Sequence, residues 1–196
     1  MEKVTILAFA GSLRKGSTNK KILKIAMRGI EEEGATLNYI DLADYPLPLY
    51  DEDIETSKGL PDNALRIKEM MNHADGFLIA TPEYNSSISG ALKNMIDWAS
   101  RPANKDEPRL LAYKGKTACL IATSPGYLGG IRSILQLRYL LSNVGVHVMP
   151  EEKFIANNTD AFDESDNLKN QKDQKALIDL SRRFVKYTQA LAPLSS

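Results

Sequence analysis

The stretch VTILAFAGSLRKGSTN, residues 4–19, decides the fold of this chain. Its first seven residues are almost all apolar, which predicts a strand buried on both faces of a sheet. Gly11 and the polar residues that follow it predict a turn, and residues 19–32 place apolar side chains along one face of a helix. A buried strand that turns into an amphipathic helix is the first unit of a parallel α/β sheet.

The same alternation continues along the 196 residues. Further strands are predicted at 36–41, 76–80, 117–123 and 144–149, and further helices at 61–73, 88–100, 131–142 and 172–190. Such alternation predicts a three-layer sandwich, in which a five-stranded parallel sheet has helices on both faces. The flavodoxin-like strand order 2-1-3-4-5 fits this number of strands. With no repeat or Gly/Ser linker, residues 1–196 are predicted to form one domain.

Composition excludes several classes of protein. Lys plus Arg and Asp plus Glu each number 25, and this zero net charge argues against nucleic acid as the main partner and against an acidic electron carrier. Cys119 is the single cysteine, and the two histidines, His73 and His147, lie far apart, so neither a disulfide nor a metal site is expected. With no long apolar run and no targeting signal, a cytoplasmic protein that does not span the membrane is predicted.

The turn after the first strand has the residue types of a phosphate site. The unpaired N–H groups and partial positive charge of a helix N-terminus bind anions, and hydroxyl, amide and guanidinium donors cluster here. The candidate residues are Gly11, Ser12, Arg14, Ser17, Thr18 and Asn19. The alternative is an ordinary helix cap by Ser17 or Thr18.

The sequence argues against two kinds of phosphate ligand, namely a nucleoside triphosphate and a dinucleotide. Gly11 and Gly16 have the spacing of a nucleoside-triphosphate loop, but Ser17 stands where that motif has lysine. The dinucleotide fingerprint G-x-G-x-x-G is also absent. A loop rich in hydroxyl groups suits a single terminal monophosphate, such as that of FMN.

Two more loops are expected at the same edge, because the carboxyl ends of parallel strands meet there. In the segment 81–87, Tyr84 offers a flat surface and Asn85 offers hydrogen bonds, which suits a flat heteroaromatic ring. A polar loop with Ser86 or Ser87 as a helix cap is an equal alternative. The glycines of segment 123–130 allow either close approach to a ligand or a flexible turn.

These motifs together resemble the NADPH-dependent FMN reductase family, which includes quinone, chromate and azo-dye reductases. The resemblance rests on GSLR at 11–14 with Ser17 and Asn19, PEYN at 82–85, LKN at 92–94 and IDWASRP at 96–102. It covers most of the chain, from about residue 4 to about residue 149. The PEYN segment combined with the Asp-Trp helix is its most specific part.

The resemblance implies a flavodoxin-like enzyme with one non-covalent FMN per subunit. The phosphate would be held by Ser12, Arg14, Ser17, Thr18 and Asn19, the ring edge by Pro82, Glu83, Tyr84, Asn85 and Ser86, and the far side of the ring or the ribityl chain by Ser124, Pro125 and Gly126. NADPH or NADH would give a hydride to FMN, and two electrons would then pass to a quinone, azo compound, chromate or free flavin in a ping-pong mechanism. No histidine or cysteine is needed as acid or base. Family members are usually homodimers or homotetramers.

Two features depart from the family pattern, namely Tyr127 and Leu128 before the double glycine and the long polar segment 156–174. Two other functions stay open. One is a flavodoxin-like electron carrier without its own turnover, and the other is a binding domain for a different monophosphate. Cys119 and His147 are predicted to be structural, and Trp98 is expected in the core or at a subunit interface.

Overall fold

Strand β1 (Thr5–Ala10) lies inside a parallel sheet, where its apolar sequence can be covered on both faces. The computed structural model describes residues 3–192. β1 pairs with β2 (Thr36–Asp41) on one side and with β3 (Gly76–Thr81) on the other, and β3 pairs with β4 (Thr117–Thr123). The order β2-β1-β3-β4-β5 confirms the predicted flavodoxin-like topology.

The edge of the sheet beside β4 differs from the single strand predicted at 144–149. β5 (His147–Val148) pairs with the start of β4, and β6 (Lys153–Ile155) pairs with its end. Pro150 lies between them and has no N–H to donate to a ladder, so one continuous strand cannot form. The sheet therefore has six strands rather than five, with two short strands sharing the fifth position.

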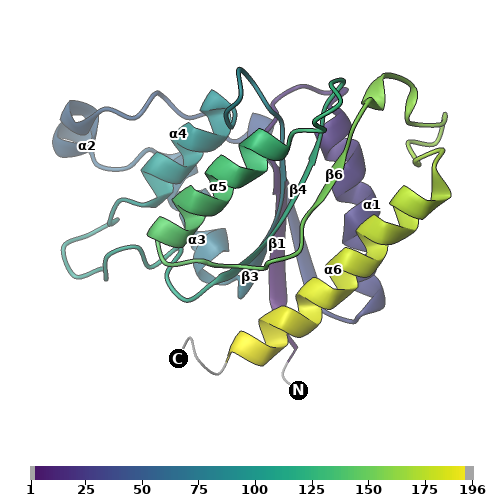
Figure 1. The fold of residues 1–196 in the computed structure, drawn as a ribbon. Helices are drawn as coiled ribbons and strands as arrows, with labels where there is room; N and C mark the ends of the chain where they lie inside the picture. The colour runs from purple at the N-terminus through teal and green to yellow at the C-terminus, as the bar shows by residue number, and fades with distance from the viewer. Residues whose placement is uncertain (1–2, 193–196) are drawn as a thin grey trace.

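Helices cover both faces of the sheet, as Figure 1 shows. α1 (Thr18–Glu32) and α6 (Gln171–Leu191) lie on one face. α3 (Asp62–Asn72), α4 (Gly90–Ala99) and α5 (Ile131–Asn143) lie on the other. Alternate side chains of β1 enter two different cores, because Ile6 packs toward α1 and α6 while Leu7 packs toward α3 and α4. The three-layer prediction is confirmed.

The segment between β2 and α3 contains elements that the sequence pattern did not reveal. η1 (Leu42–Asp44) follows β2, and α2 (Glu52–Lys58) lies in a region expected to be a loop. α2 has no buried residue, so it carries no apolar stripe to detect. Trp98, fully buried as predicted, donates from Nε1 to the Pro48 carbonyl at 2.8 Å and fixes this segment against α4.

Close packing of α1 against α6 fixes the direction in which α1 points. A Cβ on Gly29 would lie only 2.2 Å from the backbone oxygen of Ile178, so only glycine allows the two helices to approach this closely. The first turn of α1 is thereby held at the carboxyl edge of the sheet.

Within residues 3–192, no helix is both long enough and apolar enough to cross a membrane.

Candidate functional site at the carboxyl edge of the sheet

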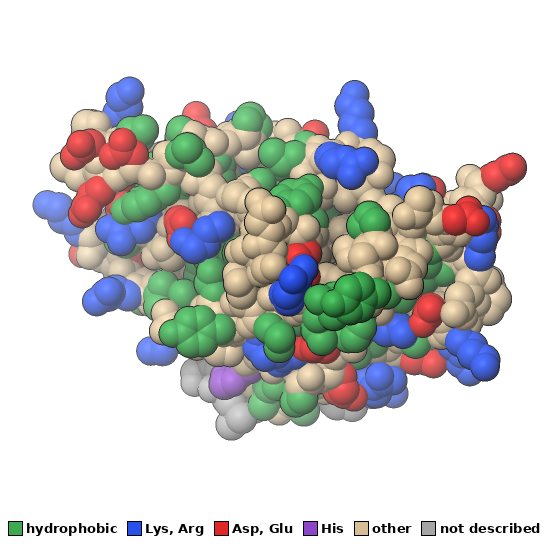
Figure 2. Space-filling view, turned by 45° about the horizontal axis from the view of Figure 1, so that its top comes forward, with side chains coloured by type: hydrophobic (Ala, Val, Ile, Leu, Met, Phe, Trp, Pro, Cys, Tyr) green, Lys and Arg blue, Asp and Glu red, His purple; other side chains and the backbone are tan. Residues whose placement is uncertain are grey.

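The loops that follow β1, β3 and β4 meet at one edge, as the topology predicts. The Gly11 N–H donates to the Ala80 carbonyl at 2.9 Å, which joins the first loop to the end of β3. The Asn19 side chain joins the start of α1 to the end of β4. Figure 2 tips this edge forward and shows mostly uncharged surface in its middle, interrupted by adjoining basic and acidic side chains, with more charges of both signs around the margin.

The first turn of α1 is open to an anion. Ser17 is the N-cap residue, but its hydroxyl makes no capping hydrogen bond. In the described part of the chain, no acceptor reaches the backbone N–H of Thr18, Asn19 or Lys20, and the first turn contains no acidic residue. The Arg14 guanidinium is exposed and has no partner among residues 3–192. These donors fit a phosphate dianion, which only accepts hydrogen bonds.

Gly11 has a packing role inside the protein in addition to the predicted one, which is to let the backbone approach a ligand. A Cβ at this position would lie 2.9 Å from Leu92 Cδ2 and 3.2 Å from Pro82 Cδ, so glycine is required by packing inside the protein. The Ser89 hydroxyl donates to the Gly11 carbonyl and accepts from the Leu92 N–H at 3.1 Å. Gly11 therefore joins the loop after β1 to the start of α4.

The loop after β3 ends in a tight reversal of the chain at residues 84–87. Tyr84 and Ser87 exchange two backbone hydrogen bonds, at 2.9 and 3.1 Å. Between them, Asn85 and Ser86 have φ values of 51° and 65°, in the left-handed region that few side chains adopt. Two consecutive positive φ values are the mark of a type I′ turn. The turn leaves Tyr84 49% exposed at the site.

Helix α5 holds this turn in place. Arg132 Nε donates to Glu83 Oε1 at 2.6 Å, and the Arg132 N–H donates to Glu83 Oε2 at 3.2 Å. Gln136 bonds both the Ser86 carbonyl, at 2.9 Å, and the Ser87 hydroxyl, at 2.6 Å. The Glu83 carboxylate is thus bound to α5, and the strained turn is fixed from outside.

The loop after β4 is tied to α1 and to a segment that lies much later in the chain. Asn19 Nδ2 donates to the Thr123 carbonyl at 3.0 Å, and the Thr123 N–H donates to Asn19 Oδ1 at 3.0 Å. Asn158, in η2 (Asn158–Asp160), donates from Nδ2 to the hydroxyls of Thr18 and Thr123 at 3.0 and 2.9 Å. Part of the polar segment 156–174 therefore belongs to the site.

The predicted residues differ in their exposure. Buried are Gly11, Ser12, Ser17, Asn19 and Pro82; half-buried are Thr18, Glu83, Ser86 and Ser124; exposed are Arg14, Tyr84, Asn85, Pro125 and Gly126. The sequence predicts that Asn19 donates to phosphate, but its amide is paired with Thr123. The cap of α4 is Ser89, not Ser86 or Ser87.

Sequence reasoning missed the contributions of Ser89, Arg132 and Asn158. Ser89 had a usable signal, because a serine directly before an apolar helix pattern is a common cap. Asn158 had none, because it lies in a polar segment without periodicity.

The three loops at this edge contain no cysteine and no histidine. Burial raises the pKa of the Cys119 thiol to about 12, so the thiolate needed for nucleophilic attack is not formed near neutral pH. His147 is exposed on the short strand β5, and His73 ends α3. Among residues 3–192, no three His, Cys, Asp or Glu side chains are grouped to hold a metal ion.

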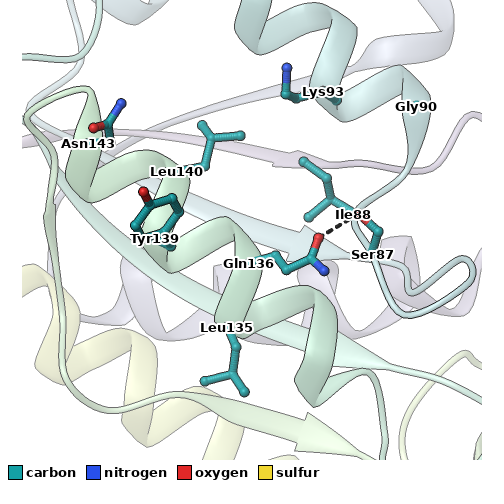
Figure 3. Close-up of a pocket in the computed structure, with 9 residues that line it drawn as sticks. All are labelled: Ser87, Ile88, Gly90, Lys93, Leu135, Gln136, Tyr139, Leu140 and Asn143. Carbon is teal, nitrogen blue, oxygen red and sulfur yellow. Dashed lines mark hydrogen bonds between the residues drawn. The ribbon is translucent and has the colours of Figure 1, made fainter.

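A large apolar groove lies beside the turn 84–87, between α4 and α5. It has a volume of about 780 Å³, and Figure 3 shows Leu135, Gln136 and Tyr139 of α5 along it, with Lys93 of α4 across from them. The Ser87–Gln136 hydrogen bond is at its end. Leu135 is 54% exposed and Tyr139 is 78% exposed. The groove and the turn thus share Ser87 and Gln136.

The fold and the site define a flavodoxin-like α/β protein whose first helix begins with hydrogen-bond donors that have no partner among residues 3–192. Residues 4–161 match the model of the NADPH-dependent FMN reductase family, and the chain belongs to this family of oxidoreductases.

Named relatives agree with this assignment. An NAD(P)H-dependent FMN reductase of Pseudomonas aeruginosa is 37% identical over 163 residues, which cover 83% of each chain. A quinone reductase of Escherichia coli K12 is 37% identical over 158 residues, covering 79% of this chain and 78% of the relative. Among solved structures, the flavoenzyme NAD(P)H:(acceptor) oxidoreductase FerB of Paracoccus denitrificans superposes with a TM-score of 0.79. It is 33% identical and covers 95% of this chain and 98% of its own.

Proposed function

We propose that this protein binds FMN non-covalently, oxidises NADPH or NADH, and reduces a small acceptor such as a quinone, azo compound, chromate or free flavin. The observation that carries the proposal is the first turn of α1, where three backbone N–H groups and the Ser17 hydroxyl have no partner in the described chain. The family assignment and the names of the relatives support the same reaction class.

Each loop has a separate part in holding FMN. Ser12, Arg14, Ser17 and Thr18 bind the phosphate together with the N–H groups of the first turn. The turn after β3 holds the ring edge through Tyr84, Asn85 and Ser86, with Pro82 and Glu83 forming its base. The loop after β4 covers the other side through Ser124, Pro125 and Gly126. Asn19 supports the phosphate loop from behind through Thr123.

The division of work between cofactor and protein follows from the residues present. Bound FMN supplies the hydride and electron chemistry. The protein binds, orients and shields, and the fixed turn at 84–87 keeps hydrogen-bonding groups beside the ring without reorganisation during the reaction. NAD(P)H and the acceptor use the same opening in turn, which gives ping-pong kinetics with parallel double-reciprocal plots.

The visible spectrum of the purified protein tests the proposal. The spectrum is then measured again after NADPH is added in the absence of oxygen. We expect absorbance near ~450 nm that bleaches with NADPH and returns with a quinone. If the protein reconstituted with FMN shows no bleaching, the proposed enzymatic activity is contradicted. A protein that bleaches but does not sustain NADPH oxidation with any small acceptor supports an electron carrier instead.

We also propose that the enzyme is a cytoplasmic homo-oligomer, in which a second copy of this chain covers the groove between α4 and α5. Leu135 and Tyr139 are exposed there, and zero net charge does not oppose self-association. We expect Tyr139→Glu to shift the mass measured by analytical ultracentrifugation toward the monomer, with exposed Tyr127→Glu as the control. An unchanged mass contradicts this role of the groove.

A further inference from the structure

Asn158 lies far from Thr18 in sequence but directly beside it in the fold. Its side chain is buried, with 3% exposure, and its Nδ2 atom lies 3.0 Å from Thr18 Oγ1 and 2.9 Å from Thr123 Oγ1. The backbone of its segment is fixed to the loop after β4, because the Asn158 N–H donates to the Ser124 carbonyl at 3.2 Å. The amide is therefore held in place on both sides.

The direction of these hydrogen bonds is set by Thr123. The Thr123 hydroxyl donates its only proton to the Ile155 carbonyl at 2.8 Å, so it can only accept from Asn158. The atom of Asn158 that faces both threonines must then be the amide nitrogen. Thr18 Oγ1 consequently accepts a hydrogen bond, and its own proton has no acceptor among residues 3–192.

We propose that Asn158 is a positioning residue that turns the Thr18 hydroxyl into a donor for the FMN phosphate. A phosphate dianion has no proton to give, so a hydroxyl must donate to be useful to it. A threonine hydroxyl in a helix can otherwise donate to the carbonyl three or four residues earlier in the chain. By donating to one lone pair of Thr18 Oγ1, Asn158 fixes the oxygen and leaves the hydroxyl proton for the ligand. This inference rests on the proposed phosphate site.

The role predicts an effect confined to the phosphate. Asn158→Ala is expected to weaken FMN binding by about 3- to 10-fold, the effect of losing one oriented hydrogen bond. Riboflavin, which has the same ring and ribityl chain without the phosphate, should bind the variant as it binds the wild type. Asn158→Asp keeps the shape of the side chain, but the carboxylate accepts the Thr18 proton and adds a negative charge. The affinity of this variant for FMN should therefore fall by more than about 10-fold.

The experiment measures dissociation constants of FMN and riboflavin for the apoproteins by quenching of flavin fluorescence, with thermal unfolding of each apoprotein alongside. Thr159→Ala is the matched control, because Thr159 is an exposed neighbour whose side chain makes no hydrogen bond to residues 3–192. In a Thr18→Val background, Asn158→Ala should cause no further loss. If Asn158→Ala and Asn158→Asp weaken FMN and riboflavin equally, or if Asn158→Ala still weakens FMN binding in the Thr18→Val background, the positioning role is wrong.

The same measurements distinguish a failure of this inference from a failure of the proposed function. A wild-type protein that binds FMN no better than riboflavin overturns the phosphate site and the role of Asn158 together. A wild type that prefers FMN, with variants that keep the full preference, overturns the role of Asn158 alone.

Discussion

Replacing Asn19 with alanine tests whether this amide holds the protein together or holds the ligand. The side chain is 4% exposed and makes two hydrogen bonds of 3.0 Å to the backbone of Thr123. Asn19→Ala leaves the buried N–H and carbonyl of Thr123 without this partner. Each such loss costs about 1–3 kcal/mol, so we expect the free energy of unfolding to fall by roughly 2–5 kcal/mol. For a chain of this length, that corresponds to a Tm lower by roughly 5–15 °C.

The assay is urea and thermal unfolding of the apoprotein, with exposed Asn38→Ala as the control. Asn38→Ala should change stability by less than about 0.5 kcal/mol. Because the apoprotein contains no flavin, a loss of stability there can only come from the protein's own contacts. If Asn19→Ala leaves apoprotein stability unchanged and lowers FMN affinity alone, the amide serves the ligand and the reasoning from Thr123 is refuted.

Three further predictions concern packing, the Glu83–Arg132 pair and the buried thiol. Gly29→Ala should destabilise the fold by about 3 kcal/mol or more in urea unfolding, because its Cβ would meet the Ile178 oxygen, whereas Gly90→Ala, with open space around it, should be nearly neutral. Arg132→Met should cost about 1–2 kcal/mol, because the Glu83 carboxylate loses its cationic partner and keeps only the hydrogen bond from the backbone N–H. Adding Glu83→Gln to this variant should restore part of the lost stability, and two losses that are simply additive would contradict the coupling. Cys119 should resist iodoacetamide at pH 8 until urea unfolds the protein, as mass spectrometry can show. Since burial raises the pKa of its thiol from 9.0 to about 12, its contribution to stability is complete below pH 9 and is lost as pH rises toward 12. Cys119→Ala should flatten this alkaline decline, and an identical decline would contradict the assignment.

The sheet and its order were predictable because the decisive strands are apolar throughout. Residues 4–10 and 117–123 can only be buried on both faces, and alternation with helices then restricts the topology. Lys153–Ile155 was missed because three residues carry too little pattern to distinguish a strand from a loop. Glu52–Lys58 was missed because it buries nothing, although Asp51 as a cap and Gly59 at its end mark its limits.

The composition of the site was easier to predict than the role of each residue within it. Hydroxyl and guanidinium donors after a buried strand indicate a phosphate site by type alone, which led to Ser12, Arg14, Ser17 and Thr18. The pairing of Asn19 with Thr123 depends on where β4 ends beside α1, a contact across 104 residues that no local pattern encodes. The same holds for Asn158, which reaches Thr18 across 140 residues.

The central claim is that the start of α1 holds the phosphate of FMN, and isothermal titration of the apoprotein with FMN and riboflavin tests it most directly. We expect the wild type to bind FMN at least ~100-fold more tightly than riboflavin, since several hydrogen bonds to a charged group are lost without the phosphate. Arg14→Ala should reduce this preference by about 10- to 100-fold while riboflavin affinity stays unchanged. Equal affinity of the wild type for the two flavins, or an Arg14→Ala variant with the full preference for FMN, would contradict the account.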